Sequence, residues 1–113
     1  MNKTKVRKIW HEFNNRIFNG EMTVPRFIKF AGSLDFDFPI DGAYLYGEMF
    51  YHKKLNNRTT RATIAHEMIH QYQEEILDID LTDEKFLAHG KTFAPLGLKF
   101  WREYKINVWI RVL

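Results

Sequence analysis

The stretch from residue 59 to residue 77 limits the possible fold more than any other part of the chain. Its apolar residues recur at three- and four-residue intervals, which predicts an amphipathic helix that Thr59 or Thr60 caps. The same stretch contains His66 and His70, and side chains four residues apart project from one face of a helix. This helix must therefore bury a stripe while it holds two imidazoles side by side. The side chains expected in the buried stripe are Ala62, Ala65, Ile69, Tyr72 and Ile76.

Two further helices are predicted, one on each side of this stretch. Residues 4–19 place apolar side chains at helical spacing, and Gly20 stands where a left-handed C-terminal cap is expected. A last helix is expected from residues 90–92 to about residue 104, with Pro95 in its first turn, where a missing N–H costs least. The side chains expected to be buried are Val6, Ile9, Trp10, Phe13 and Ile17 on the first helix, and Phe93, Leu96, Phe100, Trp101 and Tyr104 on the last.

Short strands complete the predicted fold. Weak alternation of side chains predicts strands over residues 24–30 and 106–113. The aromatic-rich segment 43–52 is expected to form a strand or a hairpin around Gly47. The sequence therefore predicts an α+β fold, with three helices packed on a small β-sheet, in a single domain spanning residues 1–113.

The composition is typical of a globular chain. Of the 113 residues, 45% are hydrophobic and 27% are charged, which is enough apolar material for one core. No stretch approaches the roughly 18–20 apolar residues that a membrane-spanning helix needs, and no apolar run follows the basic N-terminus as in a signal peptide. We therefore expect a cytoplasmic monomer with no membrane association.

The chain has five histidines and no cysteine. Disulfides and thiolate zinc sites are thus excluded, so any zinc must be held by His, Asp or Glu. Residues 66–70 read His-Glu-Met-Ile-His, which puts Glu67 beside the first of two convergent imidazoles. His89 is the predicted third ligand, because it precedes Gly90 where the last helix is expected to begin. One Zn²⁺ per chain is expected, with Glu67 as the general base that deprotonates the attacking water.

Other residues have less specific interpretations. His11 and His52 share no motif or face with the pair and are expected at or near the surface. Glu74, one turn after His70, could orient that imidazole, although a solvent-facing glutamate is the simpler interpretation. The acidic stretch 78–84 lacks the EF-hand spacing for calcium and is expected to be a solvated turn. The candidates for an oxyanion-stabilising donor, among which the sequence does not choose, are Tyr44, Tyr46 and Tyr51.

Three landmarks resemble the SprT-like domain family, which is shared by bacterial SprT proteins and the eukaryotic protease Spartan. Residues 13–22, with Phe13-Asn14 and Phe18-Asn19-Gly20, are similar to the end of the family's opening helix. Residues 66–70 resemble its metal helix. His89-Gly90-x-x-Phe93 is similar to its His-Gly-x-x-Phe motif, which supplies the third zinc ligand and an anchoring aromatic ring.

The resemblance implies a compact zincin-like core whose active-site helix carries HExxH, and a zinc metallopeptidase activity. In Spartan-like members the substrates are proteins bound or crosslinked to DNA, so DNA, including single-stranded DNA, is an implied partner beside the protein substrate. Many members carry a zinc ribbon, for which this chain has no cysteine, so DNA contact is expected from the core. The candidate basic residues are Lys53, Lys54, Arg58 and Arg61, with Lys3, Lys5, Arg7 and Lys8 as a second cluster. For both clusters, a solvated charged surface is an equally good interpretation.

Two alternatives to a DNA-linked peptidase remain open. One is a general cytoplasmic peptidase with no role for DNA. The other is a zinc-stabilised adaptor or interaction module with little or no hydrolysis. Glu67 argues against the adaptor, because a structural zinc site is normally closed by four protein ligands and needs no carboxylate beside them.

Overall fold

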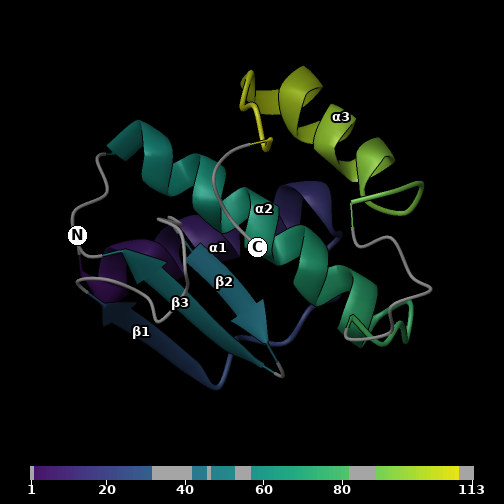
Figure 1. The fold of residues 1–113 in the computed structure, drawn as a ribbon. Helices are drawn as coiled ribbons and strands as arrows, with labels where there is room; N and C mark the ends of the chain where they lie inside the picture. The colour runs from purple at the N-terminus through teal and green to yellow at the C-terminus, as the bar shows by residue number, and fades with distance from the viewer. Residues whose placement is uncertain (1, 32–41, 46, 53–56, 82–88, 110–113) are drawn as a thin grey trace.

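Three helices and one three-stranded sheet make up the described part of the chain, which confirms the predicted α+β class (Figure 1). The computed structural model describes residues 2–31, 42–45, 47–52, 57–81 and 89–109. Within those residues, no helix combines the length and the apolar character needed to cross a membrane. The elements in chain order are α1 (Lys3–Ile17), β1 (Phe27–Ala31), β2 (Gly42–Leu45), β3 (Glu48–His52), α2 (Asn57–Glu75) and α3 (Ala94–Tyr104).

The sheet has the strand order β1-β3-β2, with β1 parallel to β3 and β2 antiparallel to β3. Strands β2 and β3 form the expected hairpin, and Gly47 in its turn has a φ of 82°, which suits glycine. The backbone N–H of Gly47 donates to the hydroxyl of Tyr44 over 3.1 Å, and the Gly47 carbonyl accepts from Arg26 over 2.8 Å. This turn therefore ties the hairpin to the segment that enters β1.

Helix α2 is the central element of the described fold. It contacts β2, α1 and α3, and Figure 1 shows it between the sheet and α3. Every residue from 62 to 71 is buried, so burial extends around the whole helix and not only along the predicted stripe. As a result His66, Glu67 and His70 enter the interior from the middle of a helix that is packed on several sides.

Two of the predicted helix starts are wrong by a few residues. Helix α2 begins at Asn57, so Thr59 and Thr60 lie inside it and do not cap it. There the carbonyl of Thr59 accepts a 2.7 Å bond from the hydroxyl of Thr63, a side-chain contact that helix interiors allow. Helix α3 begins at Ala94 and not at 90–92, because residues 90–93 form a tighter turn.

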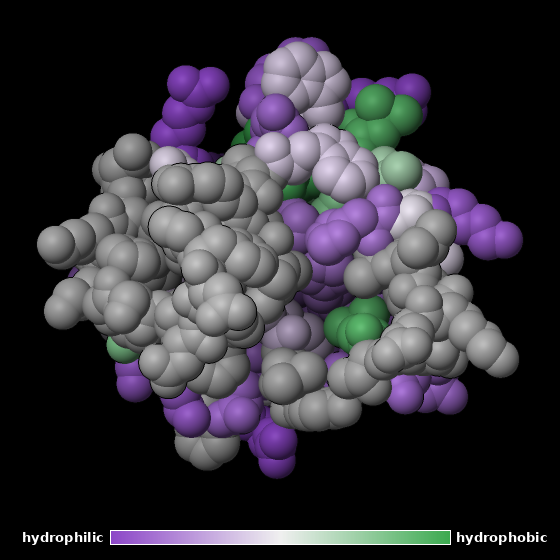
Figure 2. All heavy atoms as spheres, in the orientation of Figure 1, coloured by the Kyte–Doolittle hydropathy of each residue, from purple (hydrophilic) through white to green (hydrophobic). Residues whose placement is uncertain are grey.

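Most side chains expected in the core are buried, with two clear exceptions. The α1 stripe is confirmed in full, and Phe93 and Phe100 are fully buried. Ile76 is 36% exposed because α2 ends one residue before it, and Trp101 is 48% exposed because it lines an open groove between α2 and α3. Figure 2 shows other hydrophobic groups reaching the surface in the region of α3.

The predicted closing strand is wrong for residues 106–109, which form no strand. The carbonyl of Val108 accepts a hydrogen bond of 2.6 Å from the Nδ1 of His66, so this backbone serves an imidazole and not a sheet. Val108 also packs on α3, where a Cβ added to Gly97 would lie 2.9 Å from Cγ2 of Val108. Residues 110–113 lie outside the described part of the chain.

Candidate metal centre

Three imidazoles converge, two of them buried and that of His89 exposed, and they are the three predicted from the sequence. The Nε2 atom of His66 lies 3.1 Å from that of His70 and 3.0 Å from that of His89, and the last two are 3.1 Å apart. His66 and His70 come from adjacent turns of α2, and His89 comes from the segment that precedes α3. Together they form a group that could hold a metal ion.

The turn after His89 explains how a distant residue reaches α2. The backbone N–H groups of Phe93 and Ala94 both donate to the carbonyl of Gly90, each over 3.0 Å, so the chain reverses tightly before α3. The ring of Phe93, fully buried, then lies 4.8 Å from His66, 5.2 Å from His70 and 5.0 Å from His89, measured between ring centroids. One aromatic side chain therefore packs against all three imidazoles.

The hydrogen bonds at the far nitrogens set which atoms can bind a metal. Nδ1 of His66 faces the carbonyl oxygen of Val108 at 2.6 Å, and Nδ1 of His70 faces Oε1 of Gln73 at 2.8 Å. Both partners only accept hydrogen bonds, so each Nδ1 must carry the proton when the ring is neutral. Each Nε2 then keeps its lone pair, which is the arrangement that a metal ligand requires.

The triangle of nitrogens fits a zinc ion. Nitrogens bound at about 2.0–2.1 Å to one tetrahedral zinc lie roughly 3.4 Å apart, so the triangle need expand by only a few tenths of an ångström. Two Nε2 lone pairs pointing at each other across 3.1 Å repel, and a cation between them removes that repulsion. The donor set is all-imidazole, which suits zinc and other late transition metals.

Burial keeps the three histidines neutral. Burial, with a smaller effect from the neighbouring imidazoles, lowers the pKa of His66 to about 3 and the pKa of His70 to about 4. The hydrogen bonds to Val108 and Gln73 oppose this effect without cancelling it. Partial burial also lowers the pKa of His89, whose side chain is more exposed. At neutral pH all three rings are therefore available to a metal without first losing a proton.

Glu67 lies fully buried between the two α2 ligands in sequence, and neither of its carboxylate oxygens has a hydrogen-bond partner among the described residues. Burial raises the pKa of this carboxyl well above its usual range. The backbone of Tyr44 has a smaller, opposite effect on this pKa, although it does not meet the geometry of a hydrogen bond to the carboxylate. Buried carboxyls are normally paired, so an unpaired one that directly follows His66 in α2 is a candidate for a functional role.

Gln73 is the residue that sequence reasoning missed. Its carbonyl accepts from His70, and its amide nitrogen donates to Oγ1 of Thr92 over 3.0 Å. The sequence offers one indication of this role: Gln73 is three residues after His70, and residues at that spacing are neighbours on a helix. Glu74, which the sequence offered instead, accepts a 3.0 Å bond from the hydroxyl of Tyr44.

Among the remaining candidates, the two tyrosines that the structure describes have hydroxyl partners of their own. The hydroxyl of Tyr44 is bonded to Glu74, and the hydroxyl of Tyr51 donates to the sulfur of Met49 over 2.9 Å, while Tyr46 lies outside the described residues. His11 is exposed as predicted, and the side chain of His52 is outside the described part.

The predicted basic surface is described only in part. Arg61 pairs with Glu12 over 3.1 Å and its guanidinium carbon lies 5.0 Å above the ring of Phe13, so it is engaged within the fold. Arg58 is exposed. Both arginines line a groove, and Trp101 and Lys105 line it as well. Lys53 and Lys54 lie outside the described residues. The second cluster, Lys3, Lys5, Arg7 and Lys8, is exposed along α1.

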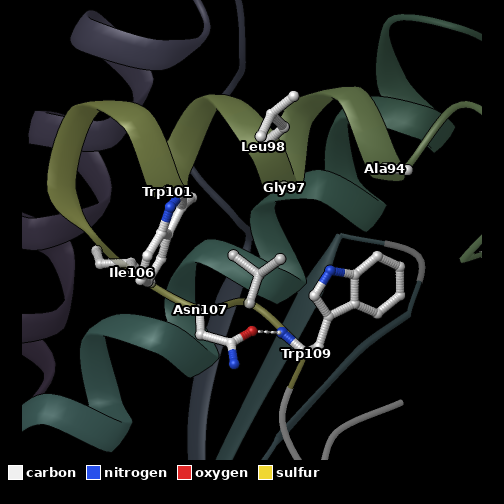
Figure 3. Close-up of a pocket in the computed structure, with 8 residues that line it drawn as sticks. Ala94, Gly97, Leu98, Trp101, Ile106, Asn107 and Trp109 are labelled. Carbon is white, nitrogen blue, oxygen red and sulfur yellow. Dashed lines mark hydrogen bonds between the residues drawn. The ribbon is translucent and has the colours of Figure 1, made fainter.

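A groove of about 380 Å³ lies between α3 and residues 106–109 (Figure 3). Trp109 lines it and is 54% exposed, with its backbone N–H bonded to Oδ1 of Asn107 over 2.9 Å. The indole centroid lies 4.9 Å from that of Phe93 and 6.2 Å from that of His89. An exposed aromatic side chain thus stands next to the most exposed of the three histidines.

Chemically, the centre offers three neutral nitrogen donors, and the same helix carries the buried carboxyl of Glu67, a set suited to metal-assisted proton transfer. Comparisons of the chain with protein-family models, with curated proteins and with solved structures find no match.

Proposed function

We propose that this chain is a zinc-dependent metallopeptidase of the SprT-like type, with His66, His70 and His89 as ligands and Glu67 as general base. The observation that carries the proposal is the triangle of Nε2 atoms, 3.0–3.1 Å on each side, with a fully buried and unpaired carboxyl on the same helix. A catalytic zinc site has three protein ligands and an open position, which matches this donor set.

His66, His70 and His89 would hold the zinc ion, which would supply a bound water with a pKa near 7 and a Lewis acid for the carbonyl group. The protein's residues supply the rest of the chemistry. His66 and His70 are held in the ligand tautomer by Val108 and Gln73. Glu67 accepts the proton of the attacking water and passes it to the leaving amine. Burial raises the pKa of this carboxyl, which makes the ionised group a stronger proton acceptor.

The fold supports the SprT-like assignment through the places of the three landmarks. Residues 13–22 fall at the end of α1, residues 66–70 in α2, and His89 to Phe93 in the turn before α3. Phe93 packs on all three imidazoles, as expected of the anchoring aromatic ring in that motif. The zincin-like core and the peptidase activity follow from this likeness together with the geometry.

The stability cost of Glu67 favours an enzyme over an adaptor. A buried polar group with no partner costs roughly 1–3 kcal/mol, and a structural zinc would gain nothing from it. Protein substrates bound or crosslinked to DNA are the proposed targets on the strength of the resemblance. Among the basic residues expected to contact DNA, Arg58 is exposed and adds a little support, whereas Arg61 is already paired with Glu12.

The test starts with zinc content and then measures cleavage of a DNA-binding protein, with and without single-stranded DNA. Glu67→Gln should keep about one zinc per chain and lose activity, because imidazole ligation does not involve the base. Glu74→Gln is the matched control, since that carboxylate is bonded to Tyr44 and should leave activity near wild type. Zinc-loaded wild type without hydrolysis would favour the adaptor, and activity indifferent to DNA would favour a general peptidase. Absence of zinc binding at neutral pH would overturn the proposal.

A further inference from the structure

The side-chain amide of Gln73 bridges two of the segments that meet at the metal centre. Gln73 is fully buried on α2. Its carbonyl oxygen lies 2.8 Å from Nδ1 of His70, and its amide nitrogen lies 3.0 Å from Oγ1 of Thr92. Thr92 stands three residues after His89, within the turn that delivers the third imidazole. One amide thus connects a ligand on α2 to the segment that holds a ligand outside it.

The two ends of the amide have opposite chemistry, and this fixes the proton on His70. The carbonyl only accepts, so Nδ1 of His70 must donate, and the lone pair is left on Nε2. A reversed amide would donate to Nδ1, which would move the proton of a neutral ring to Nε2 and prevent ligation there. The hydroxyl of Thr92 accepts from the amide nitrogen over 3.0 Å and so holds the amide in place between the two segments.

Gln71 provides a contrast on the same helix. It is also buried, and its amide carbonyl accepts from Trp10 over 3.0 Å. Its amide nitrogen donates to the backbone carbonyl of Thr23 over 2.6 Å and to Glu75 over 2.9 Å. None of these partners is a histidine. Two glutamines two residues apart therefore serve different networks, one within the fold and one at the metal centre.

We infer that Gln73 is a positioning residue for the metal centre, setting the tautomer of His70 directly and the place of His89 through Thr92. This deepens the proposed function, because it rests on metal binding by the three histidines, but it does not depend on hydrolysis. Metal-ligating histidines commonly donate their other N–H to such a partner, and losing that partner typically weakens metal binding 10–100-fold.

The first test is zinc affinity, measured by competition with a chromophoric chelator. Gln73→Met should weaken zinc binding about 10–100-fold. Gln73→Glu keeps an acceptor opposite His70 and should stay within a few-fold of wild type. Thr92→Val should weaken binding by less, and should add no further loss in the Gln73→Met background, because it acts through that amide. Gln71→Met is the matched control, expected to lower the unfolding temperature while leaving zinc affinity unchanged.

The second test determines which ring nitrogen of His70 carries the proton in metal-free protein. Long-range ¹H–¹⁵N correlation spectra should show His70 protonated at Nδ1 in wild type and in Gln73→Glu, and a mixture of tautomers in Gln73→Met. Circular dichroism establishes that each variant is folded. Wild-type zinc affinity in Gln73→Met, or an unchanged His70 tautomer there, would overturn the inference. If zinc-loaded wild type shows no hydrolysis, while Gln73→Met still weakens zinc binding and alters the His70 tautomer, the peptidase proposal is overturned and this inference stands.

Discussion

Nδ1 of His66 and the carbonyl oxygen of Val108 lie 2.6 Å apart, although the two residues are 42 positions apart in the chain. This bond makes the segment after α3 part of the metal centre. It gives His66 the same protonation pattern that Gln73 gives His70, with the proton on Nδ1 and the lone pair on Nε2. Two buried ligands are therefore oriented by unrelated partners, one a backbone carbonyl and the other a side-chain amide.

Gly97→Ala should disturb that bond from a distance. A Cβ at Gly97 would lie 2.9 Å from Cγ2 of Val108, so Val108 must shift and take its carbonyl away from His66. Overpacking of this kind costs about 1–3 kcal/mol, against a gain of about 1 kcal/mol from alanine in a helix. We expect a small net loss of stability and a several-fold loss of zinc affinity, measured by thermal unfolding and by chelator competition.

Arg102→Ala serves as the control for that substitution, because Arg102 is exposed on the same helix. It should change neither stability nor zinc affinity appreciably. If Gly97→Ala binds zinc as tightly as wild type, Val108 does not hold His66 in the way that its 2.6 Å contact indicates.

His89→Ala should separate metal binding from folding. His89 is the most exposed of the three ligands, so its removal should change the stability of metal-free protein by no more than about 0.5 kcal/mol. Zinc affinity should fall by more than about 100-fold, since a ligand contributes more than its outer partners do. Titration with zinc followed by calorimetry measures the binding.

His70→Ala removes another of the three imidazoles, and it should destabilise metal-free protein more than His89→Ala does. It leaves the buried carbonyl of Gln73 without its imidazole partner, which should destabilise metal-free protein by about 1–3 kcal/mol. Equal stability of the two alanine variants would contradict the assignment of His70 as the buried, hydrogen-bonded ligand.

The three histidines of the candidate metal centre were predictable because their spacing and their positions are visible in the sequence itself. A helix places residues 66 and 70 on one face whatever surrounds it, and His89 stands where the chain turns into the last helix. The partners of these ligands were not predictable in the same way. A backbone carbonyl such as that of Val108 has no side-chain signature, and its alternating neighbours suggested a strand. Gln73 carries no charge and no motif, so only the packed structure distinguishes it from Gln71.

The α+β class was also predictable, whereas exact element ends and some burial were not. Periodicity along residues 4–19 identified the buried face of α1 correctly, because that helix packs on one side only. For α2 the same reasoning found a stripe where the whole middle of the helix is buried, since tertiary contacts on several sides override amphipathicity. Trp101 was expected inside because it is large and apolar, yet it faces a groove.

Glu67→Gln should stabilise the metal-free protein, and the gain should grow with pH. Burial raises the folded-state pKa of this carboxyl, so its contribution to stability is complete below an unfolded pKa near 4.5 and is lost as pH rises towards the folded value. Within that window each pH unit costs wild type up to about 1.4 kcal/mol, and glutamine does not titrate. Urea unfolding with chelator at pH 4, 6 and 8 measures the difference, which should be smallest at pH 4. A difference independent of pH would show that the carboxyl keeps its ordinary pKa.

Acid should destabilise the same Glu67→Gln variant through the histidines, with Glu67 no longer contributing. The folded-state pKa values of His66 and His70 lie at about 3 and about 4, below the ordinary value of 6.5. Lowered values of this kind give stability that is present above pH 6.5 and lost as pH falls towards the folded values, because only the unfolded chain takes up protons in that window. The free energy of unfolding should fall by up to about 1.4 kcal/mol per pH unit for each histidine. Adding His70→Ala should lower that slope between pH 6 and pH 4.5 and leave the contributions of His66 and His89. Urea unfolding with chelator present measures the slope, and an unchanged slope would mean that His70 titrates normally in the folded protein.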